Sequence, residues 1–143
     1  MKLKFKELQV PRIDSPNFFM SPIELKDFID FEVKRIYFIT QPKGEMQSGA
    51  HCHKIEKELF VMIQGTCTAV IDNGGREREI SMKGPTSAMY VGEYVWHHFK
   101  NFSEDAILLA ISSTNYNPNR EDYIENYEEY KEKMNNYEKM EKD

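Results

Sequence analysis

The chain has 143 residues, of which 40% are hydrophobic and 13% aromatic, and its formal net charge is −5. A chain of this length can bury a core without disulfide staples, so we expect a single domain over residues 1–143. From Glu121 onward nine acidic residues stand against four lysines, which leaves residues 1–120 with fifteen charges of each sign. A body without excess positive charge argues against a nucleic-acid partner, because such surfaces normally carry a net basic face.

The opening residues of the chain favour the cytoplasm, and this compartment decides the expected state of the two cysteines. The chain opens with lysines at alternate positions instead of an apolar leader, and no apolar run approaches the length of a membrane span. We therefore expect a cytoplasmic protein with no membrane partner. In that reducing compartment Cys52 and Cys67 are expected to be free thiols, and a structural disulfide is the less favoured alternative.

The N-terminal part is predicted to contain two strands and one short helix. Residues 2–9 alternate polar and apolar side chains, which is typical of an edge strand, and such an edge can pair with a second subunit. Ser21 and Pro22 are typical of a helix start, as N-cap and first helical residue, and we expect this helix to end near residue 28. Residues 31–39 alternate again, with Arg35 and Tyr37 on one face.

The middle of the chain is predicted to be a series of short strands. Residues 72–75, Asp-Asn-Gly-Gly, are typical of a hairpin turn, because primed turns need residues that tolerate positive φ. Besides the histidine-bearing segment near residue 50, the expected strands are residues 66–71, 77–82, 88–91, 95–102 and 107–112. One short helix among so many strands argues for an all-β fold, an antiparallel barrel or sandwich.

Residues 121–143 are predicted to form an acidic helical tail. Aromatic and methionine side chains recur there at intervals of three and four on a charged background, which is the pattern of an amphipathic helix. We expect the first turns of this helix to pack on the barrel. The last residues have little to hold them and are expected to fray.

The most informative segment is residues 49–65. His51 and His53 are two residues apart, so on a strand they point to one face while Cys52 points to the other. Glu58 follows His53 after four intervening residues, and a glycine follows Glu58 after six. This spacing resembles the first motif of the cupin superfamily, in which such imidazoles lie inside a small β-barrel.

The second cupin motif has a partial match, because His97 and Asn101 keep the expected interval. Together the two motifs imply a cupin-type antiparallel β-barrel (jelly roll) with a short N-terminal helix and a C-terminal helical tail. His98 should face away from His97, so its expected role is structural.

A metal site is one interpretation of these residues. His51, His53, Glu58 and His97 form a reasonable ligand set for a divalent transition metal. The alternative for any single histidine is a hydrogen-bonded role in the core. For the pair His51 and His53 a functional role is favoured, because burying two imidazoles without a task is costly.

Four segments in chain order carry a more specific resemblance. They are Lys34-Arg35-Ile36-Tyr37-Phe38-Ile39, Gly49-Ala50-His51-Cys52-His53-Lys54, Val95-Trp96-His97 and Glu121-Asp122-Tyr123-Ile124-Glu125-Asn126-Tyr127. In combination they resemble the nucleotide-linked 4-keto-6-deoxysugar 3,4-ketoisomerases, a family of the cupin superfamily. The resemblance covers about residues 30–130.

The resemblance implies an enzyme that converts dTDP-4-keto-6-deoxyglucose to a dTDP-3-keto-6-deoxyhexose, in the synthesis of deoxyaminosugars for bacterial surface polysaccharides such as O-antigen. It implies a homodimer that exchanges N-terminal strands, with residues 1–10 as the exchanged strand here. It also implies catalysis without metal or other cofactor. The family's active-site histidines correspond to His51 and His53, and its tyrosine to Tyr37.

The residue types suit this reaction. The hydrogen on C3 lies α to the C4 ketone, and a neutral imidazole with a pKa near the working pH can remove it and return a proton at C4. We assign His51 as the base at carbon, with His53 and Tyr37 acting on the oxygens.

Three residues are assigned to substrate binding: Arg35, Trp96 and His97. Arg35 suits a diphosphate, because a guanidinium matches phosphate geometry, and the alternative is an ordinary ion pair in the barrel wall. Trp96 can stack on a nucleobase, and the alternative is simple packing.

The sequence also departs from the family pattern. Ser48 stands where family members commonly carry an arginine, which weakens the argument for how the substrate is held. Glu58 replaces a usual glutamine and restores the acidic cupin ligand, and Gly92-Glu93 replaces a Pro-Pro pair. Two alternative functions therefore stay open: a metal-dependent cupin enzyme that uses His51, His53, Glu58 and His97, and a non-catalytic cupin that binds a sugar nucleotide.

Overall fold

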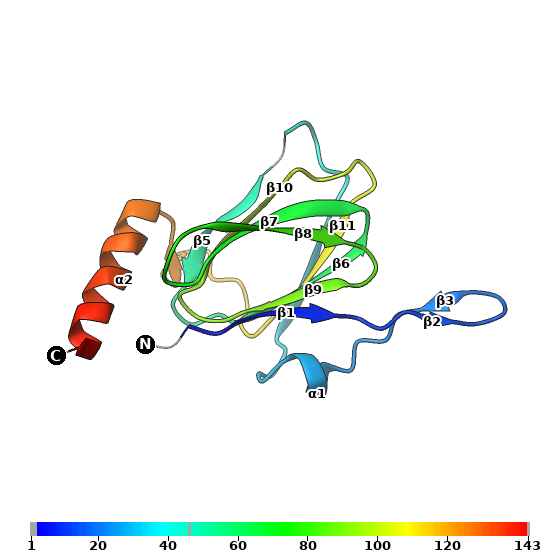
Figure 1. Cartoon of the computed structure of the whole chain (residues 1–143), viewed down its shortest axis with the longest axis horizontal. Helices are drawn as coiled ribbons and strands as arrows, with labels where there is room; N and C mark the ends of the chain where they lie inside the picture. The colour runs from blue at the N-terminus through cyan, green and yellow to red at the C-terminus, as the bar shows by residue number, and fades with distance from the viewer. Residues whose placement is uncertain (1–2, 46, 143) are drawn as a thin grey trace.

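The structure, a computed structural model, describes residues 3–45 and 47–142 and contains twelve strands and two helices within them (Figure 1). The strands are β1 Phe5–Gln9, β2 Ile13–Asp14, β3 Phe19–Met20, β4 Arg35–Thr40, β5 Ser48–His53, β6 Glu58–Gln64, β7 Thr66–Asp72, β8 Arg78–Lys83, β9 Ser87–Val91, β10 Trp96–Lys100, β11 Ile107–Ser112 and β12 Tyr123–Ile124. The helices are α1 Leu25–Phe28 and α2 Tyr127–Lys142. The strands predicted in the middle of the chain are confirmed, with ends that differ by a few residues.

Two five-stranded antiparallel sheets make up the body of the molecule. One has the strand order β1-β9-β6-β11-β4 and the other β12-β5-β10-β7-β8. The all-β, antiparallel, cupin-like architecture is therefore confirmed. The strands are hydrogen-bonded as two separate sheets, so a single closed barrel, as the resemblance implied, is not what the backbone pairing gives.

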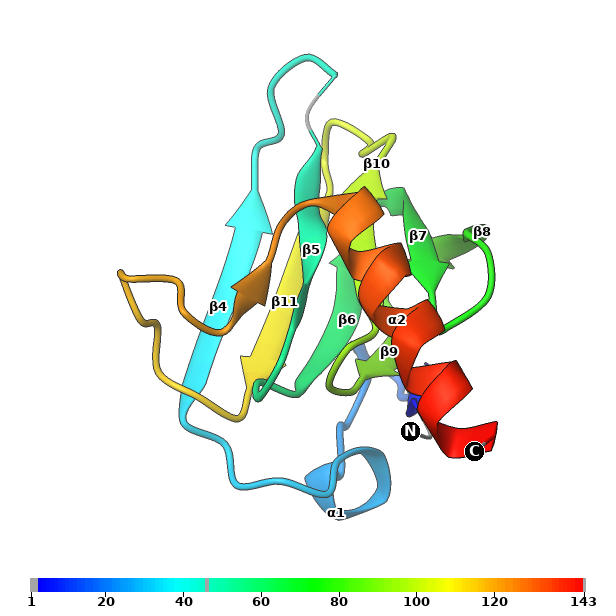
Figure 2. The same ribbon diagram turned by 90° about the vertical axis from the view of Figure 1, so that its left-hand side faces the viewer.

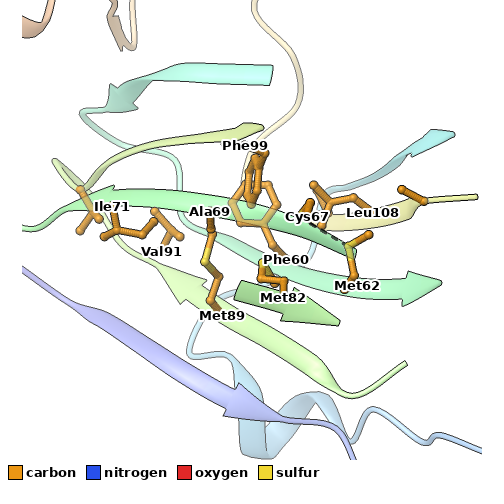
Figure 3. Close-up of a cluster of buried hydrophobic side chains, with 13 residues drawn as sticks. Phe60, Met62, Cys67, Ala69, Ile71, Met82, Met89, Val91, Phe99 and Leu108 are labelled. Carbon is orange, nitrogen blue, oxygen red and sulfur yellow. Dashed lines mark hydrogen bonds between the residues drawn. The ribbon is translucent and has the colours of Figure 1, made fainter. Parts of the chain in front are cut away.

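The core lies between the two sheets. Figure 3 shows its centre, where Phe60 and Met62 from β6 meet Phe99 from β10 and Met89 from β9. Side chains of β4 alternate between the core and the outer face of the first sheet. Tyr37 packs against the core, whereas Ile36 and Phe38 are 60% and 66% exposed on the outer face. Burying one face of each sheet stabilises the fold by roughly 25 cal/mol for each Å² of apolar surface removed from water.

The N-terminal elements differ from the sequence predictions. Strand β1 pairs with β9 of its own chain, with Phe5 opposite Val91, and the first residue of the predicted strand, Lys2, lies outside the described residues. Helix α1 is a single turn whose N-cap is Glu24, without a side-chain capping bond. The predicted start at Ser21 is therefore wrong. A small hairpin, β2–β3, projects from the sheets on the side away from α2 (Figure 1).

The predicted C-terminal helix is confirmed as α2, which lies across the outer face of the second sheet (Figure 2). Beneath it, Cys52 from β5 and Trp96 from β10 pack against Tyr130. Tyr127 Oη donates a hydrogen bond of 2.6 Å to Asp72 Oδ2, which fastens the first turn to the end of β7. The expected fraying concerns the end of the chain, and Asp143 lies outside the described residues.

Two further findings concern the whole chain. Cys52 and Cys67 are both buried free thiols, as predicted. Over residues 3–45 and 47–142, neither helix combines the length and the apolar character that crossing a bilayer requires.

Candidate active site

Strands β5 and β10 bring three histidines together. His51 and His53 lie on one face of β5 with ring centroids 4.6 Å apart, and Cys52 points to the other face beneath α2. His97 on β10 is paired directly with His51, with ring centroids 5.0 Å apart. The predicted face of the two β5 histidines and their proximity to His97 are confirmed.

Glu58 joins the cluster from the first position of β6. It is 2% exposed, and its Oε1 lies 3.3 Å from His53 Nε2 and 3.7 Å from His97 Nε2. Tyr37 Oη donates a hydrogen bond of 2.8 Å to Glu58 Oε2. The tyrosine and the glutamate singled out in the sequence therefore contact each other, and the glutamate contacts His53 and His97.

Two acidic residues of the site were missed in the sequence. Glu56 is 3% exposed, and its Oε2 lies 3.0 Å from His53 Nε2, while Ser112 Oγ donates to its Oε1. Asp122 approaches the other side of the ring, with Oδ2 3.1 Å from His53 Nδ1. The available signals were weak: Glu56 is two residues before Glu58, and Asp122 lies within a segment quoted only for family resemblance.

The three imidazoles have different charge states. Burial, with His97 and His53 nearby, lowers the pKa of His51 to about 3, and burial also lowers the pKa of His97. Burial alone would do the same to His53, but its hydrogen bond to Glu58 and the surrounding carboxylates raise its pKa. The lowered pKa values favour neutral His51 and His97 at neutral pH, and the raised pKa of His53 favours its protonated form. The expectation that the base has a pKa near the working pH is wrong for His51.

The neighbouring acids are also unequal. Burial opposes ionisation of Glu58, yet its hydrogen bond from His53 and its electrostatic interactions with His97 and His53 lower its pKa to about 2. Burial and the charge of Glu58 raise the pKa of Glu56. Burial and Glu58 raise the pKa of Tyr37, so its phenol keeps its proton. Environments that give similar titratable groups very different pKa values are typical of acid–base sites.

Arg35 lines a cavity of about 210 Å³ together with Glu56, Asp122, Tyr116 and Tyr123, and two of these residues, Glu56 and Asp122, contact His53. Its Nη2 donates to Glu56 Oε1 at 3.1 Å. Within the described part of the chain its buried Nε has no hydrogen-bond partner. The ion pair in the wall is therefore observed, and diphosphate binding by Arg35 stays a prediction.

Two aromatic residues of β10 lie outside the cluster. Trp96 is 3% exposed and packs on Tyr127 and Tyr130 at centroid distances of 5.1 and 5.4 Å, on the opposite face from His97. The structure does not bring Trp96 to the site, and its alternative packing role is the one observed. The side chain of His98 points away from His97, as predicted, and interacts electrostatically with Glu77 and Glu79.

The structure also brings together the residues of the metal interpretation. Ligand atoms of His51, His53, Glu58 and His97 all lie within 4.8 Å of one another. His97 Nδ1 lies 3.0 Å from the carbonyl oxygen of Val95, which favours a proton there and a free lone pair on Nε2. The set therefore fits a divalent transition metal, which would act as a Lewis acid on a carbonyl oxygen.

The fold and the site define the class of the protein: a cupin-like pair of antiparallel sheets that holds histidines of adjacent strands against a buried glutamate. Residues 1–135 match the family described as FdtA: WxcM-like, C-terminal. The chain belongs to this family.

The relatives agree on one kind of enzyme. A TDP-4-oxo-6-deoxy-alpha-D-glucose-3,4-oxoisomerase of Aneurinibacillus thermoaerophilus is 36% identical over 109 residues, which cover 76% of this chain and 77% of that protein. A 3,4-ketoisomerase from Helicobacter canadensis has a TM-score of 0.82 at 32% identity, over 93% of this chain and 98% of that one.

A third relative is known with ligands. QdtA, a sugar 3,4-ketoisomerase from Thermoanaerobacterium thermosaccharolyticum solved in complex with TDP, has a TM-score of 0.82 at 27% identity, over 93% of this chain and 96% of that one. A variant of QdtA has been solved in complex with TDP-4-keto-6-deoxyglucose.

Proposed function

We propose that this protein is an isomerase that converts TDP-4-keto-6-deoxyglucose to a TDP-3-keto-6-deoxyhexose. The observation that carries the proposal is that His51, whose pKa is lowered, lies beside the paired His53 and Glu58, in a chain that belongs to the FdtA family. The relative from A. thermoaerophilus, at 36% identity, bears the name of this activity. We propose that the reaction serves deoxyaminosugar and O-antigen synthesis, as the family resemblance implies.

We assign to His51 the removal of the proton from C3. The hydrogen on C3 is acidic because its loss gives an enediolate conjugated with the C4 oxygen, and His51 is neutral and can accept it. Within the described residues no side chain forms a hydrogen bond with the His51 ring, whereas both nitrogens of His53 face carboxylates. Return of the proton to C4 completes the carbon part of the isomerisation.

We assign to His53 and Tyr37 the proton transfers at O4 and at the C3 hydroxyl. As the enediolate forms, O4 gains negative charge, and an imidazole whose raised pKa favours its protonated form, together with the protonated phenol of Tyr37, stabilises such a charge. O4 must then gain a proton and the C3 hydroxyl must lose one. Tyr37 is a suitable relay, because its hydrogen bond to Glu58 connects it to His53.

Substrate binding is assigned to Arg35 and His97. Arg35 lines the cavity, and the geometry of a guanidinium suits a diphosphate oxygen. His97 lies on the inner side of the cluster, where a neutral imidazole can bond to a sugar hydroxyl.

The metal-dependent alternative is kept as a second candidate because the four-residue ligand set is assembled. We expect catalysis without a metal, as the family resemblance implies. A bound ion would be held by His51, His53, Glu58 and His97.

The protein is also proposed to act as a homodimer. Several apolar side chains of the β2–β3 hairpin are exposed, with Phe18 at 61% and Phe19 at 59%, and Phe38 is exposed on the outer face of β4. Apolar side chains gathered in this way are typical of an interface. Exchange of residues 1–10 would replace the pairing of β1 and β9 within one chain by the same pairing between two chains.

The decisive experiment supplies the purified protein with TDP-4-keto-6-deoxyglucose in deuterium oxide and follows the sugar by NMR. We expect deuterium at C3 and a 3-keto product, which a coupled 3-aminotransferase would convert to an identifiable aminosugar. The assay is repeated after chelator treatment with the metal content measured. Full activity without metal supports the proposal, and activity that disappears with a stoichiometric metal supports the metal-dependent enzyme.

A further inference from the structure

The carboxylate of Asp122 contacts the whole turn that follows His53. Its Oδ1 accepts a hydrogen bond of 2.6 Å from the backbone N–H of Ile55, and its Oδ2 accepts one of 3.2 Å from the N–H of Glu56. Its backbone carbonyl accepts a bond of 2.9 Å from the N–H of Lys54. Asp122 is 69 residues from His53 in sequence, so this turn is held by the C-terminal part of the chain.

The same carboxylate fixes the orientation of the His53 ring. Oδ2 lies 3.1 Å from His53 Nδ1, and the opposite nitrogen, Nε2, lies 3.0 Å from Glu56 and 3.3 Å from Glu58. A carboxylate on one ring nitrogen sets both the tautomer and the direction of the other. His53 therefore presents Nε2 toward Glu58 only while Asp122 holds Nδ1.

The residue next to Asp122 supports the same ring from a second side. Strand β12 pairs with β5 so that Tyr123 is opposite His53. The Tyr123 ring lies 4.4 Å from the His53 ring and 4.8 Å from the His51 ring, measured between centroids. The segment that carries Asp122 thus touches both histidines of β5.

We propose that Asp122 is a positioning residue of the isomerase, which keeps a proton on His53 Nδ1 and shapes the turn of residues 54–56. It acts through His53 and is not assigned a contact with the reacting atoms. The inference rests on the proposed function for its activity measurement only, because the state of the His53 ring can be observed without substrate.

The test is the substitution Asp122→Asn. The amide is uncharged and has one oxygen, whereas the carboxylate accepts from the N–H groups of Ile55 and Glu56 and lies against His53 Nδ1. Nδ1 therefore loses its anionic partner, and the proton of the ring is expected on Nε2, where Glu56 and Glu58 remain. Long-range ¹H–¹⁵N NMR of the histidine side chains reports this proton directly, with His53 assigned by the signal that His53→Asn removes. We expect a protonated Nδ1 in the wild type and an unprotonated Nδ1 in the variant.

Activity provides the second measurement. Loss of a carboxylate that orients a functional histidine typically costs on the order of 10–100-fold, so we expect kcat of Asp122→Asn to fall by that factor with KM nearly unchanged. Glu121→Gln removes the same charge from the neighbouring position and should retain wild-type kcat. Circular dichroism of each variant verifies the fold.

Each outcome decides the matter. Wild-type kcat in a folded Asp122→Asn protein, or an unprotonated Nδ1 in the wild type, would overturn the inference. If the variant does not fold, the wild-type spectrum alone still decides the state of Nδ1. If the wild type shows no deuterium exchange at C3, the proposed function fails, while the NMR comparison continues to test the role of Asp122.

Discussion

The two histidines of β5 show how neighbours decide the chemistry of identical side chains. His51 and His53 leave the same face of one strand, but carboxylates surround only His53. Burial without an ionic partner lowers the pKa of an imidazole, and neighbouring carboxylates raise it. The pair can therefore provide a neutral base beside an imidazole that favours its protonated form.

The assignment of His51 predicts the outcome of a single substitution. His51→Asn keeps a polar side chain but removes the base, and loss of a positioned base costs on the order of 10²–10⁴ in rate. We expect deuterium incorporation at C3 to slow by that factor while binding of TDP is nearly retained. Exchange at the wild-type rate in His51→Asn would show that another group removes the proton.

The control for His51→Asn lies on β10, the neighbour of β5 in the sheet. His98→Asn changes the same residue type outside the cluster and should leave exchange at C3 unchanged.

The lowered pKa of His51 predicts the pH profile. With an ordinary pKa of about 6.5, only about a tenth of the base would be neutral at pH 5.5. Because the pKa of His51 is lowered to about 3, we expect the exchange rate at pH 5.5 to stay within about twofold of that at pH 7.5. If the protein is still folded at pH 5.5 and its exchange rate there is tenfold lower than at pH 7.5, the pKa of His51 is not lowered to about 3.

The same pKa has a consequence for stability with a definite sign. The unfolded state binds the His51 proton below about pH 6.5, and the folded state does so only below about 3, so this group's contribution to stability is lost as the pH falls between these values. The raised pKa of His53 acts in the opposite direction, since its contribution is present at low pH and is lost as the pH rises through the folded value.

At the scale of elements, the turn between β6 and β7 explains the glycine of the cupin-like motif. Gly65 has φ +76°, and a Cβ there would lie 2.8 Å from Ala106 Cα and against Ser103 Oγ. We expect Gly65→Ala to lower the free energy of unfolding by about 1–3 kcal/mol, because a side chain is strained in this conformation. Chemical denaturation measures the change.

A second glycine provides the matched control for Gly65. A Cβ on Gly75 would meet no atom within 4 Å, and its φ is not in the left-handed region. We expect Gly75→Ala to change stability by less than about 0.5 kcal/mol. Equal losses in the two variants would show that neither the backbone angle nor the close approach constrains Gly65.

The elements also show what the sequence can predict. Strand alternation placed His51 and His53 together, because the period of two is local. It could equally have separated Trp96 from His97, since adjacent residues face opposite sides. Asp122 could not be found in this way, because its contact with His53 depends on how the C-terminal segment returns to β5. Contacts at that separation follow from the fold, not from local pattern.

At the scale of the whole molecule, the exposed apolar surface near the N-terminus predicts a dimer. Replacing Phe18 and Phe19 of the projecting hairpin by serine removes apolar area that an interface would bury. We expect the wild type to sediment as a dimer and the double variant to shift toward monomer. Met140→Ser removes a side chain that is 73% exposed on α2 and should leave the dimer intact. A monomeric wild type would refute the proposal.

Strand exchange can be separated from simple docking by a cross-link. Gln9 in β1 is paired with Ser87 in β9, so cysteines at both positions are neighbours whichever chain supplies β1. If each chain keeps its own β1, oxidation gives a cross-link within one chain and a monomeric band on a non-reducing gel. We expect exchange, and therefore a covalent dimer band that the reducing agent removes. The native cysteines do not compete, because Cys52 and Cys67 are buried on separate faces of the second sheet. A monomeric band from a protein that sediments as a dimer would show that the subunits dock without exchanging strands.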